Sequence, residues 1–144
     1  MNSTKLPYTS QIIAHALRLT PGKDLYQEIK TYIQAHNIEA GFIMTCVGSL
    51  QQTNIRLANA NAFMKSNEHY EITSLVGCIS CKDRMHLHIS IADSKGNSFG
   101  GHLCDKGNLI FTTAEIIIGE LPSLIFTKEM DNESGWDELK INKK

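Results

Sequence analysis

Three histidines lie within the stretch Met85–Cys104, and imidazole nitrogens are common protein ligands of divalent metal ions. The stretch reads MHLHISIADSKGNSFGGHLC, which predicts a strand, a tight turn and a second strand. Residues two apart on a strand point to the same face, so His86 and His88 share one face while Leu87 and Ile89 share the other. The apolar face can pack into a core, which leaves the histidine face for water, a metal or a partner.

The turn between the two strands decides whether the third histidine joins the first two. The glycine that ends Ser94–Gly96 suits a three-residue loop, in which a type I turn is followed by a left-handed residue. Counting back from that loop, His88 faces His102 and His86 faces Cys104, so all four side chains lie on one face. A two-residue loop would shift the register by one and turn His102 to the opposite face.

Three neutral imidazoles suit a borderline divalent ion, and we predict zinc bound by His86, His88 and His102. Three protein ligands leave a fourth position open, as in catalytic sites where a bound water ionises near neutral pH. Cys104 as a fourth ligand would instead close the site and make it structural. The alternative to a metal site is a set of solvated strand histidines.

Further candidate residues lie around and outside this hairpin. Glu115 interrupts an apolar strand and is a candidate general base beside a metal-bound water, although a paired or exposed carboxylate is the plainer interpretation. Ser49 stands in a Gly-Ser-Leu turn that resembles a phosphate-binding turn, but the P-loop pattern is missing. Glycines before the third histidine permit close approach of a ligand or another backbone. The predicted site-lining residues are therefore Ser49, Arg56, Gly100 and Gly101.

The cysteines carry a weaker signal than the histidines. Cys78 and Cys81 have the C-x-x-C spacing of redox or zinc sites, but no second pair follows and they continue a strand. Two independent cysteines are the preferred interpretation. Cys46 lies in an apolar run and is expected in the core.

The composition is that of an ordinary globular domain. The 144 residues fit one domain, with 42% hydrophobic and 20% charged residues. A formal net charge of −1 and only three arginines give no general attraction to nucleic acid or anionic membrane. There is neither an apolar run of about 18 residues nor an apolar signal core at the N-terminus. We therefore expect a cytoplasmic protein with reduced cysteines and no membrane partner.

The elements that must position the histidines are mostly strands. A helix is predicted over residues 24–36, because Leu25, Ile29, Tyr32 and Ile33 follow a 3.6-residue period. One helix among seven to eight strands predicts a single α+β domain with a mostly antiparallel sheet. We expect a flexible arm over 1–9, the domain over 10–130, a loop over 59–67 and a polar tail over 131–144. The expected strands cover residues 11–19, 40–48, 53–60, 70–81, 85–92, 98–104, 108–119 and 124–129.

Taken in order, several stretches resemble the plants and prokaryotes conserved (PPC) domain. They are ALRLTPGKDL (16–25), AGFIMTCVGSL (40–50), YEITSLVG (70–77), HLHISIAD (86–93), GGHL (100–103) and TTAEIIIGEL (112–121), with SGWDEL (134–139) similar to the closing segment. The resemblance covers about residues 12–139. It implies an α+β fold assembled as a homotrimer. Stand-alone prokaryotic members look like metal binders through an H-x-H plus G-G-H set, which maps onto His86, His88 and His102.

The resemblance implies no agreed reaction or substrate. Plant members carry AT-hooks, which bind A·T-rich DNA, and this chain has no such segment. We predict a homotrimer that binds a divalent metal, with an unknown small molecule as a further partner; whether it is an enzyme stays open. The alternatives are a DNA-binding or transcription-associated protein, which is the usual label of stand-alone members, and a protein-assembly module.

Overall fold

The computed structural model describes residues 7–59 and 61–144, and no helix among them is both long and apolar enough to cross a membrane. These residues form one α-helix, α1 (Leu25–Ala35), and ten strands. The strands are β1 (Ile13–Leu19), β2 (Gly41–Leu50), β3 (Thr53–Arg56), β4 (Phe63–Ser66), β5 (Tyr70–Ser80), β6 (Arg84–Ala92), β7 (Ser98–Leu103), β8 (Ile110–Glu120), β9 (Leu124–Asp131) and β10 (Trp136–Lys143).

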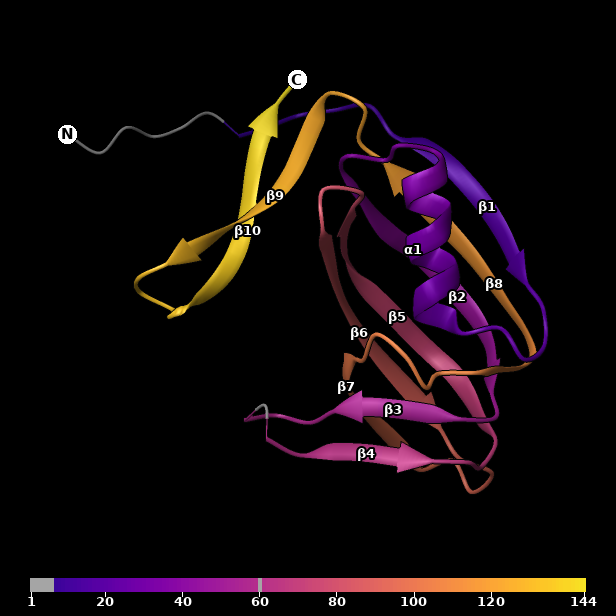
Figure 1. The fold of residues 1–144 in the computed structure, drawn as a ribbon. Coiled ribbons are helices and arrows are strands. Elements are labelled where there is room, and N and C mark those ends of the chain that lie inside the picture. Colours follow the sequence, from indigo (N-terminus) through magenta and orange to yellow (C-terminus); the bar gives the residue numbers. More distant parts are fainter. Residues whose placement is uncertain (1–6, 60) are drawn as a thin grey trace.

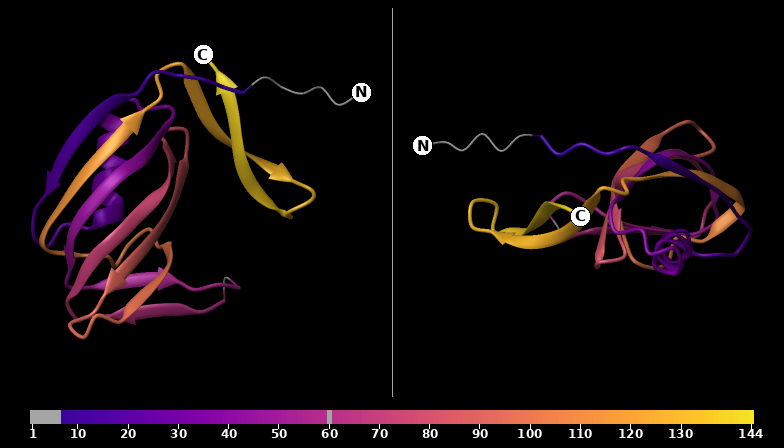
Figure 2. Two further views of the ribbon diagram at one scale, coloured as in Figure 1. Left: turned by 180° about the vertical axis from the view of Figure 1, so that it is seen from behind. Right: turned by 90° about the horizontal axis from the view of Figure 1, so that it is seen from above.

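Eight of the strands form one antiparallel sheet in the order β1-β8-β2-β5-β6-β7-β3-β4, and β9 pairs with β10 in a separate two-stranded sheet. The predicted α+β class with one helix is confirmed. The large sheet curves around α1, and the β9–β10 hairpin extends to one side of it (Figures 1 and 2).

The predicted helix is confirmed, and its ends follow the sequence signals. Asp24 is the N-cap, and its side chain accepts hydrogen bonds from two backbone N–H groups of the first turn. Leu25, Ile29 and Ile33 are fully buried on the face turned to the sheet. The chain leaves the helix at Asn37, whose φ of 50° is left-handed.

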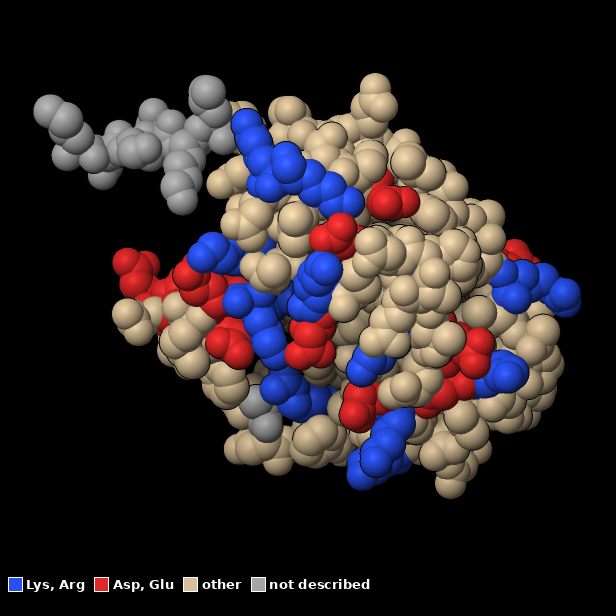
Figure 3. All heavy atoms as spheres, turned by 45° about the horizontal axis from the view of Figure 1, so that its top comes forward, with Lys and Arg blue, Asp and Glu red and all other residues tan. Residues whose placement is uncertain are grey.

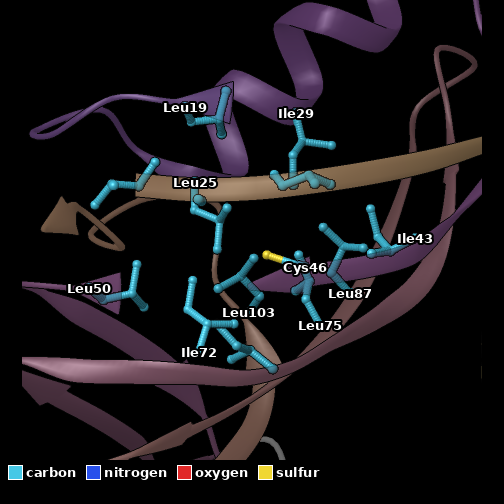
Figure 4. Packing of buried hydrophobic residues seen from close by; sticks show 14 of the residues in the cluster. Leu19, Leu25, Ile29, Ile43, Cys46, Leu50, Ile72, Leu75, Leu87 and Leu103 are labelled. Atoms are coloured by element: carbon cyan, nitrogen blue, oxygen red, sulfur yellow. The ribbon is translucent and has the colours of Figure 1, made fainter. Parts of the chain in front are cut away.

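The core lies between α1 and the concave face of the sheet (Figure 4). Leu75, Leu87 and Leu103 reach it from the three adjacent strands β5, β6 and β7, and each is at most 2% exposed. Because neighbours along a strand alternate between faces, the burial of Leu87 places His86 and His88 on the opposite face. The core therefore fixes which way the histidines point.

Two segments expected to lack regular structure are strands. Phe63–Ser66 lies in the predicted loop but pairs with β3, and Met64 packs against the core. The predicted polar tail contains β10, whose Leu139 and Ile141 pack against the cluster formed by Ala40, Leu124 and Phe126. Both strands depend on a pairing partner rather than on their own propensity.

The other expected strands are present with shifted ends, and β3 stops at Arg56 rather than reaching residue 60. Residue 60 and residues 1–6 of the expected arm lie outside the described residues. Tyr8, near the end of that arm, packs against the cluster of Ala40, Leu124 and Phe126.

Candidate metal centre

The β6–β7 hairpin has the register that brings the third histidine to the first two. Gly96 donates its N–H to the Asp93 carbonyl, and Asp93 donates to the Asn97 carbonyl, which closes the predicted three-residue loop. Gly96 has a φ of 83°, the left-handed conformation that this loop requires. His88 then lies directly opposite His102, and the predicted register of this pair is confirmed.

The three histidines converge on one another. Nε2 of His86 lies 3.3 Å from Nε2 of His88, and one potential ligand atom from each of the three rings falls within 4.8 Å of the others. Two nitrogens bound tetrahedrally to one zinc ion at the usual bond length are separated by about 3.3 Å. The His86–His88 spacing already matches that separation.

The donor set fits a metal in a second respect. Nδ1 of His102 is buried and has no hydrogen-bond partner in the described part of the chain. A buried ring nitrogen without a partner is costly, and an ion bound at the cluster provides one way to satisfy it.

The surroundings keep two of the rings in the form that binds metal. Burial, followed by the positive charge of Arg56 and by His86 and His88, lowers the pKa of His102 to about 4. Burial also lowers the pKa of His86, helped by Arg84 and His88 and opposed by Glu138. Both rings are therefore neutral at pH 7, and only a neutral imidazole has a lone pair for a metal ion.

Arg84 determines which ring nitrogen of His86 carries the proton. Its Nη2 lies 3.1 Å from Nδ1 of His86. A guanidinium only donates, so Nδ1 of His86 accepts and the proton of the neutral ring is on Nε2. Nε2 of His88, at 3.3 Å, is then the acceptor for that proton. In this arrangement the arginine orients the ring through a hydrogen bond that it donates from outside the cluster.

The histidines lie in the wall of an open cavity of about 960 Å³. The sheet side of this wall comes from β6, β7 and the segment around the end of β3, and the opposite side comes from the β9–β10 hairpin. The lining includes Arg84, His86, His88, Gly100, Gly101, His102, Arg56, Leu57, Lys128, Trp136, Asp137 and Glu138. The space is large enough for a small molecule beside an ion.

Three of the four residues predicted to line the site lie in the wall of this cavity: Arg56, Gly100 and Gly101. Gly101 admits another backbone rather than a ligand, because a Cβ there would lie 2.5 Å from the carbonyl oxygen of Arg56. That close approach holds Arg56 directly opposite His102 on the neighbouring strand.

The structure does not bring the remaining candidates to the histidines. Glu115 is exposed on β8, which is separated from β6 by β2 and β5. Ser49, on β2, makes a 2.6 Å hydrogen bond with Thr112 on β8. Cys104 follows β7 and donates its N–H to Asn54, and its thiol is not in the histidine group. Burial raises the pKa of the Cys104 thiol, which disfavours the thiolate that a metal ion requires.

Sequence reasoning missed Arg84 and the residues of β10. Arg84 stands two positions before His86, so the same period of two that paired the histidines also places it on their face. The sequence signal for β10 was weaker, because charged residues surround its apolar positions Leu139 and Ile141.

A comparison with protein families finds one that matches most of the chain. The sequence profile of the Plants and Prokaryotes Conserved (PCC, also written PPC) domain matches residues 7–122. A curated relative, the bifunctional protein GlmU of Synechococcus sp. (strain JA-3-3Ab), is 39% identical over 135 residues, which cover 94% of this chain and 21% of that protein. The chain thus spans about a fifth of the length of that relative.

Solved structures share the whole fold. A hypothetical protein from Salmonella cholerae-suis has a TM-score of 0.91 and 34% identity, and the match covers 94% of this chain and 97% of that one. A metal-containing protein from Archaeoglobus fulgidus has a TM-score of 0.80 and 24% identity, covering 94% and 99%. A proposed DNA-binding protein from Bacteroides thetaiotaomicron has a TM-score of 0.77 and 20% identity, covering 92% and 96%.

Proposed function

The chain belongs to the Plants and Prokaryotes Conserved domain family, and from that premise we propose that it binds one divalent metal ion, zinc in the first place, through His86, His88 and His102. The observation that carries the proposal is the convergence of three imidazoles, two of them held neutral, in the wall of a cavity. The metal-containing relative from Archaeoglobus fulgidus supports it as a protein of the same fold that holds a metal.

The residues around the cluster suit this role. His86, His88 and His102 supply three ligands, and Arg84 lies beside them with Nη2 at 3.1 Å from Nδ1 of His86. A bound zinc ion would supply Lewis acidity at its open position. The cavity of about 960 Å³ gives a small molecule access to that position. The proposal is one of metal and small-molecule binding, and it assigns no role to Glu115, because β8 is separated from β6 by two strands of the same chain.

Metal analysis of protein purified without chelators or a histidine tag tests the proposal. We expect about one equivalent of zinc per chain, lost in His86→Ala and retained in His69→Ala. His69 is a matched control because it stacks on Phe111, away from the cluster. A wild-type protein that takes up no divalent metal, even when zinc is added, would contradict the proposal.

We also propose the homotrimer that the family resemblance implies. Met44, Val47 and Val76 are 47–56% exposed on β2 and β5, and such side chains offer a contact surface. Light scattering coupled to size exclusion should give the mass of three chains. The mass of one chain at micromolar concentration would refute assembly.

DNA binding is the second candidate, favoured by the proposed DNA-binding relative from Bacteroides thetaiotaomicron. The charge pattern gives it little support: the net charge is −1, and acidic side chains lie among the basic ones on the face in Figure 3. DNA binding predicts a mobility shift on A·T-rich duplex that weakens steeply with salt. The absence of a shift at low salt would exclude this candidate.

A further inference from the structure

Two arginines, Arg56 and Arg84, lie in the cavity wall. Neither Arg56 nor Arg84 forms an ion pair within the described residues, and the Nε of each is buried without a hydrogen-bond partner. Arg84 is only 8% exposed; its Nη1 donates to the backbone carbonyl of Asp137 and its Nη2 to His86. A buried guanidinium is costly unless an anion compensates its charge.

The charges of the lining show which ligand would compensate it. The wall carries three cationic side chains, Arg56, Arg84 and Lys128, and three acidic ones, Asp83, Asp137 and Glu138. Lys128 and Asp83 pair with each other at 3.3 Å. The acidic and cationic side chains of the lining therefore balance, and a divalent ion bound by the three imidazoles adds two positive charges. Such a site favours an anion.

Metal binding also acts directly on Arg84. Coordination through Nε2 of His86 would move the ring proton to Nδ1, where it would meet the Nη2–H donor of Arg84. Coordination through Nδ1 would displace Arg84 from that nitrogen. On either route the Nη2 edge of the guanidinium loses its present acceptor. A freed Nη2–H beside an unpartnered Nε–H is the donor pair with which arginine binds carboxylates and phosphates side-on.

We propose that the metal-loaded cavity binds a small molecule through an oxyanionic group, a carboxylate or a phosphate, with Arg84 and Arg56 as its positioning donors. This inference rests on the metal binding proposed above. The alternative role for Arg84 is structural: its hydrogen bond to the Asp137 carbonyl connects the start of β6 to β10.

Calorimetric titration of the cobalt-loaded protein with acetate and with inorganic phosphate tests the inference. The visible spectrum of bound Co²⁺ reports in the same samples whether the metal is present and whether the anion reaches it. We expect saturable binding that chelation abolishes, weakened at least about tenfold in Arg84→Lys and in Arg56→Met, because each loses a charge-assisted hydrogen bond. Arg18→Met is the matched control, since Arg18 is exposed on β1 away from the cavity.

The outcomes separate the two proposals. Failure of the wild type to load cobalt or zinc overturns both the metal site and the anion site. Loading without saturable anion binding, or anion binding equal in the wild type and the arginine variants, overturns the anion site alone. Tighter binding of acetate than of phosphate identifies a carboxylate ligand, and the reverse order identifies a phosphate. If Arg84→Lys does not fold, Arg56→Met decides.

Discussion

Gly77 lies on β5 directly opposite Leu87, which stands between His86 and His88 on the neighbouring strand. Its φ of 147° is one that side-chain-bearing residues rarely adopt, and a Cβ there would lie 1.9 Å from the carbonyl oxygen of His86. Gly77→Ala therefore has to push back the backbone that carries His86. Backbone strain costs about 1–3 kcal/mol and overpacking about 1–3 kcal/mol more, so the expected loss of stability is about 2–6 kcal/mol.

Urea unfolding at 25 °C, followed by circular dichroism, measures this loss. Gly22→Ala is the matched control, because Gly22 has a φ of 78° but no atom within 4 Å of the added Cβ. It should lose only about 1–2 kcal/mol. Gly77→Ala should also weaken zinc binding, whereas Gly22→Ala should not. Equal destabilisation by the two substitutions would refute the argument that close packing at Gly77 positions His86.

Three further predictions follow from the same geometry. Leu87→Ala, at a fully buried position, should lower the free energy of unfolding by about 2–5 kcal/mol. His88→Ala, on the exposed face, should lower it by under about 1 kcal/mol. Similar losses in the two variants would contradict the assignment of the two faces of β6. The fold lowers the pKa of His102 from 6.5 to about 4, so the unfolded chain takes up a proton first as pH falls through this window. The melting temperature of chelator-treated protein should therefore fall between these pH values, and His102→Gln should flatten the fall; an unchanged profile would refute this. Zinc at a hundredfold excess over its dissociation constant should stabilise the wild type by about 2.7 kcal/mol in thermal unfolding, and an equal gain in His86→Ala would contradict the site.

The histidine hairpin could be predicted because its determinants are local. Alternation fixes the faces of His86 and His88, and the loop ending at Gly96 fixes the partner of His88. The helix could be predicted for the same reason, because its N-cap Asp24 and the 3.6-residue period of its buried face lie within one stretch of sequence.

The position of Glu115 and the contribution of the β9–β10 hairpin to the cavity could not be predicted, because both depend on how distant strands are arranged in space. Nothing near Glu115 in the sequence reveals that β8 joins β1 and β2, which removes this carboxylate from the histidines. The sequence signals for the β9–β10 hairpin were weak: a turn ending in Gly135, and the two apolar residues Leu139 and Ile141 at alternate positions after it. The charged residues of that segment favoured a solvated tail, yet this hairpin supplies Trp136, Asp137 and Glu138 to the cavity wall.

The central claim is that three histidines on two adjacent strands hold one metal ion. Diffraction data collected on both sides of the zinc absorption edge, from crystals of protein supplied with zinc, test it most directly. We predict an anomalous peak that appears only above the edge, at about 2.0–2.1 Å from one ring nitrogen each of His86, His88 and His102. Crystals of zinc-supplied protein with no such peak at the three rings, or with the peak on other residues, would contradict it.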